Sequence, residues 1–129
     1  MLFPAMALAY VNAPPATSPA TLRQWRARLR FHAVGDRMPL GGLYTDHGDG
    51  REDGYYAMLA DRWQFDVRAL YVVSFGQLAR VRALRGLSEP GVMRALDLPV
   101  YSLEWLSVDR PLTTDRYCGI SLREYLSRP

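Results

Sequence analysis

The segment of the chain richest in reactive side chains is DHGDGREDG, residues 46–54. Its four carboxylates belong to Asp46, Asp49, Glu52 and Asp53. Several oxygen ligands on a tight turn are what a hard cation such as Ca²⁺ requires. A calcium loop, however, places its acids at alternate positions and ends with a glutamate at the twelfth, and this segment does not. Arg51 would also compete with a cation for the carboxylates. We therefore expect no metal site here.

The same acidic loop has a simpler structural interpretation. Its glycines suit turn positions with positive φ, and Asp53 is placed to cap a following helix. An exposed loop of negative charge is suited to recognise a basic protein surface. We therefore predict that Asp46, Asp49 and Glu52 contact a partner.

A second set of chemically capable residues is a histidine, a tyrosine and a glutamate in that order. They occur in FHAV, GGLYTD and YSLEWL, as His32, Tyr44 and Glu104. This order resembles that of the ADP-ribosyltransferases that use a His-Tyr-Glu set. The resemblance implies NAD as the cofactor, with the histidine holding the ribose, the tyrosine stacking on nicotinamide and the glutamate orienting a ribose hydroxyl. The small residues that usually follow the histidine are replaced here by Ala33 and Val34.

Other catalytic signatures are absent from the sequence. It contains no GxSxG, P-loop, GxGxxG or HExxH motif and no pair of cysteines for zinc. The sequence thus gives no cofactor outside the NAD alternative, and a function in binding is favoured over catalysis.

Charge is distributed unevenly along the chain. All 16 basic residues are arginines, and the formal net charge is +3. Residues 1–45 carry a net charge of +4, residues 46–70 one of −3, and the remainder one of +2. Arg23, Arg26 and Arg30 recur at helical spacing, so they form one basic row. We predict that Arg23 and Arg26 contact a partner, and nucleic acid is the second alternative because arginine binds phosphate.

The elements that must position these residues follow from hydrophobic periodicity and turn signals. Residues 1–18, rich in Pro and Ala, are predicted to form an extended arm. Ser18 and Pro19 then begin a helix whose apolar residues include Trp25. Helices are predicted over 18–29, 54–63, 76–86, 88–97 and 121–129. Trp63 is expected on the apolar face of the second of these helices, and Ser88 is expected to start the fourth. Strands are predicted over 28–34, 41–46, 67–75 and 99–108.

These elements predict an α+β fold. We expect residues 19–129 to form one compact domain, with several short helices and a small mixed or antiparallel sheet of about four strands. No window is long and apolar enough to span a membrane. The opening residues lack the basic region of a signal peptide, so a cytoplasmic protein is expected.

The favoured function is a small non-enzymatic protein-binding module, such as an inhibitor, immunity, adaptor or regulatory protein of bacterial or phage origin. Tyrosine, tryptophan and arginine dominate interface energetics, and the chain has eight tyrosines and three tryptophans. The expected partner is another protein, with a basic surface that would meet the acidic loop. Assembly into a homo-oligomer stays open.

Overall fold

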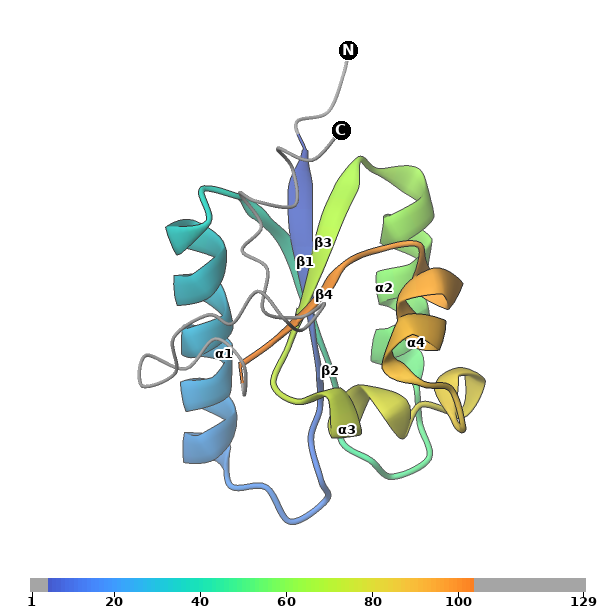
Figure 1. Cartoon of the computed structure of the whole chain (residues 1–129). Helices are drawn as coiled ribbons and strands as arrows, with labels where there is room; N and C mark the ends of the chain where they lie inside the picture. Colours follow the sequence, from blue (N-terminus) through green and yellow to red (C-terminus); the bar gives the residue numbers. More distant parts are fainter. Residues whose placement is uncertain (1–4, 104–129) are drawn as a thin grey trace.

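The computed structural model describes residues 5–103 of the chain. Within them, strands and helices alternate in one small domain (Figure 1). The strands are β1 (Met6–Asn12), β2 (Leu40–Asp46), β3 (Val67–Val72) and β4 (Val100–Ser102). The helices are α1 (Pro19–Gly35), α2 (Asp53–Gln64), α3 (Phe75–Ala79), the 3₁₀ turn η1 (Arg82–Leu84) and α4 (Glu89–Leu96). A single domain of mixed helices and strands with a four-stranded sheet agrees with the prediction.

The strand pairing differs from the mixed or antiparallel sheet that was predicted. The order is β2-β1-β3-β4, and every pair in it is parallel. Parallel neighbours need a crossover, and a helix supplies each one here. Helix α1 covers one face of the sheet, while α2, α3 and α4 cover the other (Figure 1). The fold is therefore a doubly wound α/β arrangement.

The predicted N-terminal arm is corrected by strand β1. Residues Met6–Asn12 form an interior strand, and Ala7 through Asn12 are buried. A parallel strand covered on both faces reads as a continuous apolar run without alternation, as MALAYV does. Pro14 and Pro15, which favoured an arm, follow the strand. The domain therefore begins before residue 19.

The predicted strand over residues 28–34 is also corrected, because α1 continues to Gly35. Ser18 caps the helix as predicted, its side chain accepting from the backbone N–H of Thr21. Leu29 and Ala33, four residues apart, are the buried positions of the C-terminal half. The alternation of apolar and polar residues in RLRFHAV does not mark the two faces of a strand, because Phe31, between the buried Leu29 and Ala33, is 68% exposed.

The remaining elements agree with the prediction in type, with three differences. The predicted helix over 76–86 breaks into α3 and η1. Trp63, expected on the buried face of α2, is 64% exposed. The predicted strand over 99–108 ends at Ser102 within the described residues, and the helix predicted over 121–129 lies outside them.

The sheet separates two apolar cores because its side chains alternate between its faces. Ala7, Ala9 and Val11 of β1 pack with Leu29 and Ala33 beneath α1. On the other face, Leu8 and Tyr10 belong to the core beneath the remaining helices. Among the described helices, none combines the length and apolar character that a membrane span requires.

A β-bulge at Gly41 shapes the start of edge strand β2. Ala7 pairs with Leu40 and the next residue, Leu8, pairs with Gly42, so Gly41 is the extra residue. The bulge shifts the alternation of side chains by one position. Leu40 and Leu43 therefore both pack toward the core beneath α1.

Candidate functional site

The first carboxylate of the acidic loop has a structural role. Asp46 is 5% exposed and accepts hydrogen bonds from the Tyr10 hydroxyl at 2.6 Å and from the backbone N–H groups of Gly54 at 2.8 Å and Tyr55 at 2.9 Å. These bonds join β1, the end of β2 and the first turn of α2. Asp46 was predicted to contact a partner, but its burial removes it from the surface that a partner would reach.

The rest of the acidic loop is held by local contacts. The Asp49 side chain accepts from the backbone N–H of Arg51, and Glu52 accepts from the backbone N–H of Arg82. Asp53 is the first residue of α2 and not its cap as predicted; Glu52 stands at the cap position without a side-chain cap bond. Asp49 remains exposed. Nowhere in residues 5–103 do histidine, cysteine and acidic side chains group as a metal site.

The predicted NAD-binding residues are not brought together by the described part of the fold. His32 lies on helix α1, not on a strand, and α1 covers one face of the sheet. Tyr44 lies on β2, packs against the core on the opposite face, and donates its hydroxyl to Asp61 of α2. Glu104 lies outside the described residues.

The ionisation of these two side chains follows from their surroundings. Burial lowers the pKa of His32 from its ordinary value, the positive charge of Arg28 lowers it further, and Asp36 opposes both. Burial and the hydrogen bond to Asp61 raise the pKa of Tyr44 well above its ordinary value. At neutral pH the uncharged form of both side chains therefore predominates.

Open α/β sheets usually bind ligands at the carboxyl ends of their strands. The usual position is the switch point, where the connections that leave two neighbouring strands run to opposite sides of the sheet. Here that point lies between β1 and β3. The Asn12 side chain donates to the backbone carbonyl of Gln77 at 3.2 Å, and Ser74 caps α3. Ser102 donates to the carbonyl of Val73. Gln77 Oε1 is buried and receives no hydrogen bond within the described residues.

The arginine row of α1 faces the outer edge of the sheet. Residues three and seven positions apart return to one side of a helix, so Arg23, Arg26 and Arg30 share a side. Arg26 marks its direction, because its guanidinium donates to the Thr45 hydroxyl of edge strand β2 at 2.8 Å. Arg26 Nε is buried and has no partner within the described residues. Arg23 and Arg30 are exposed.

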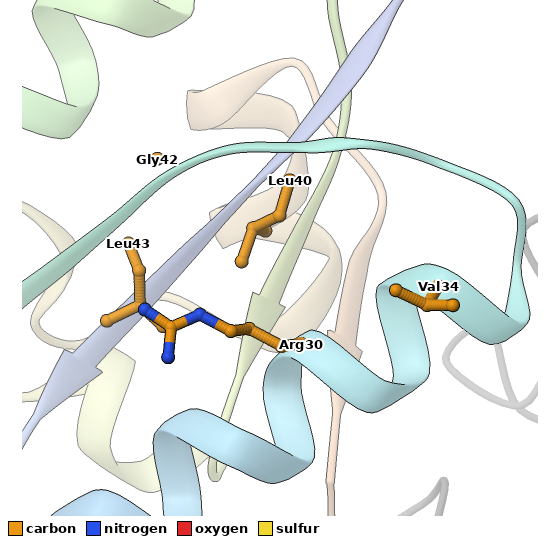
Figure 2. A pocket seen from close by; sticks show the side chains of 5 residues that line it. All are labelled: Arg30, Val34, Leu40, Gly42 and Leu43. Carbon is orange, nitrogen blue, oxygen red and sulfur yellow. The ribbon is translucent and has the colours of Figure 1, made fainter.

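An open groove of about 330 Å³ lies between α1 and β2. It is lined by Arg30, Val34, Leu40, Gly42 and Leu43. Figure 2 shows the Arg30 side chain reaching from α1 toward Leu43. Val34 is 75% exposed at its rim. We call these five lining residues, together with Arg23 and Arg26, the α1–β2 groove.

The sequence patterns indicated the arginines of this groove but not its apolar residues, Val34, Leu40 and Leu43. The mistaken strand over 28–34 separated Val34 from the helix that carries it. A usable signal was present, because Arg23, Arg26, Arg30 and Val34 continue one helical spacing without a break.

The outer edge of β2 completes the site. Strand β2 ends the sheet order, so no other strand within residues 5–103 pairs with this edge. An edge strand directs part of its backbone N–H and C=O groups away from the sheet. The α1–β2 groove therefore combines backbone hydrogen-bonding groups, apolar side chains and positive charge.

The fold and this groove define a small doubly wound α/β protein with a basic, partly apolar cleft along an edge strand. Comparison of the chain with family models, with curated proteins and with solved structures gives no match.

Proposed function

We propose that this chain is a non-enzymatic protein-binding module whose partner docks in the α1–β2 groove. The observation that carries the proposal is a groove in which the exposed Val34 and the half-buried Leu40 and Leu43 lie with arginines. It runs beside a strand edge that pairs with no other strand among the described residues. The proposal keeps the predicted class of function and the predicted contacts of Arg23 and Arg26, and it moves the rest of the interface from the acidic loop to the groove.

Charge supports an acidic partner. Helix α1 contains four arginines and no acidic residue. Within residues 5–103, no carboxylate forms an ion pair with Arg23 or Arg30. Unpaired arginines speed association with an opposite charge and bind carboxylates through two parallel hydrogen bonds.

Apolar contacts support a protein over a small ion as the ligand. Val34 at the groove and Phe31 on the outer side of α1 are 75% and 68% exposed. Burying side chains of this size favours association, because each removes a large apolar area from water. Arginine is also among the residues enriched at the energetically important positions of interfaces.

Polar groups elsewhere support binding over catalysis. Asp46, Asn12 and Ser102 at the carboxyl ends of the strands are engaged in internal hydrogen bonds. These hydrogen bonds hold the loops in place, and they occupy the polar side chains that a reaction at this edge would need. The carboxyl edge is therefore the weaker candidate for the function.

The test compares partner binding by the wild-type chain with binding by two groove variants, Arg30→Glu and Val34→Asp. Immobilised full-length chain is exposed to a lysate of the source organism, and retained proteins are quantified. The control is Arg80→Glu, the same charge reversal at an exposed position outside the groove. We expect one stoichiometric protein that both groove variants lose and the control retains. Equal retention by all four chains would refute the proposal.

A further inference from the structure

We infer that the partner contributes an extended acidic segment that adds to the sheet as a new strand beside β2. This inference rests on the proposed function and specifies the ligand of the same groove. Strand addition uses main-chain hydrogen bonds for affinity and side-chain pockets for specificity. The α1–β2 groove offers both along one line.

The backbone of β2 supplies the first part of the argument. Its residues from Gly42 to Asp46 pair in regular register with Leu8 to Asn12 of β1, so this stretch of the edge contains no bulge. The bulge at Gly41 ends that regularity on the N-terminal side. An added strand would therefore align with residues 42–46 and meet Leu43 at the groove.

Side chains of α1 supply the second part. Figure 2 shows the Arg30 guanidinium beside Leu43 of β2, and both residues line the groove. Val34 and Leu40 offer an apolar surface next to it. Because successive side chains of a strand point to opposite faces, every second residue of the segment would face α1. Those residues are expected to be acidic or apolar.

A second copy of this chain fits the groove less well. Two copies pairing through β2 in antiparallel orientation would bring their α1 helices side by side on one face of the joined sheet. Each helix carries four arginines and no acid, so the interface would juxtapose like charges. An acidic segment removes that repulsion.

Nucleic acid also fits the groove less well. Phosphates would pair with the arginines, but they would leave the strand edge and the apolar side chains of Val34, Leu40 and Leu43 unused. A peptide engages all three features of the groove. We therefore assign the site to a peptide segment with carboxylate side chains.

The experiment selects ligands from a displayed library of random peptides of about ten residues. Selection uses the full-length wild-type chain, with counter-selection on Arg30→Glu. Enriched peptides are expected to carry carboxylates and apolar residues at alternating positions. Their affinity, measured by fluorescence anisotropy, is expected to fall about tenfold or more on Arg30→Glu and to be unchanged on Arg80→Glu.

Methylation of the peptide backbone tests strand addition itself. Replacing N–H by N-methyl at every second residue removes the donors on one edge of the peptide. One of the two alternate patterns should weaken binding by about tenfold or more, and the other should not. Equal effects of both patterns would overturn the inference.

Other outcomes separate this inference from the proposed function. If no peptide is enriched while a retained protein still depends on Arg30 and Val34, the strand-addition inference fails and the proposed function stands. Concentration-dependent dimerisation of the wild type that Arg30→Glu abolishes would identify a second copy as the occupant. Tighter binding of a double-stranded DNA probe than of any selected peptide, lost on Arg30→Glu, would identify nucleic acid. Each of these results would overturn the inference.

Discussion

The Tyr10 hydroxyl donates a hydrogen bond to the Asp46 carboxylate at 2.6 Å, and both side chains are buried. The bond crosses between two neighbouring parallel strands, β1 and β2. Asp46 also receives two backbone N–H groups at the start of α2. The Asp46 carboxylate therefore links the interior strand β1, the edge strand β2 and helix α2. These bonds hold β2 in place beside the groove.

Removing the Tyr10 hydroxyl is expected to destabilise the fold. Tyr10→Phe leaves the buried carboxylate with one donor fewer, which should lower the free energy of unfolding by about 1–3 kcal/mol. Denaturant unfolding measures the change. Tyr56→Phe is the matched control, because Tyr56 is 58% exposed and should change stability little. Equal effects of the two substitutions would contradict the role given to the Tyr10–Asp46 bond.

Two glycine substitutions are expected to have opposite signs. A Cβ at Gly54 would lie 2.8 Å from the Thr45 carbonyl oxygen and 2.9 Å from Asp46 Oδ1. Gly54→Ala should therefore cost about 1–3 kcal/mol, by overpacking. A Cβ at Gly35 would meet nothing within 4 Å, so Gly35→Ala should stabilise by about 0.4–1 kcal/mol. Thermal unfolding of both variants checks the signs, and a stable Gly54→Ala would show that the loop is not packed as described.

The tryptophan on α2 should contribute little to stability. Trp63 is 64% exposed, whereas Met58 of the same helix is 0% exposed. Trp63→Gln is expected to change the free energy of unfolding by about 0.5 kcal/mol or less. Met58→Ala should cost about 2–5 kcal/mol, because it leaves a cavity in the core. A Trp63→Gln variant as unstable as Met58→Ala would place Trp63 in the core after all.

Stability should fall in mild acid through His32. Burial lowers the pKa of this side chain in the folded state below its ordinary value of 6.5. Below about pH 6.5 the unfolded chain therefore binds more protons than the folded chain, and the free energy of unfolding decreases as the pH falls. Urea unfolding between about pH 7.5 and pH 5 measures the slope. His32→Gln should reduce it, and an unchanged slope would exclude His32 as a cause.

Local signals predicted much of the fold. Serine caps at Ser18 and Ser88 and the apolar run of β3 lie where the sequence indicated. Long-range pairing could not be read in the same way. A strand buried on both faces carries no alternation, so β1 looked like part of an arm. Without β1, the regular succession of strand and helix that indicates a parallel sheet was hidden.

The candidate site was only half predictable for a related reason. Helical spacing revealed Arg23 and Arg26, but nothing in the sequence tells which strand a helix face meets. The hydrogen bond from Arg26 to Thr45 supplies that direction. Asp46 was wrongly predicted to be exposed, because a carboxylate in a glycine-rich loop usually is. The three internal donors that bury it come from distant parts of the chain or from the next helix.

Amide hydrogen exchange of the full-length chain, with and without a selected peptide, tests the central claim most directly. If the peptide binds in the α1–β2 groove, amide exchange should slow in β2, Leu40–Asp46, and in the C-terminal half of α1. Exchange in the acidic loop, residues 47–51, should not change. Protection confined to the acidic loop, with β2 unaffected, would contradict the account and return the interface to the segment that the sequence first singled out.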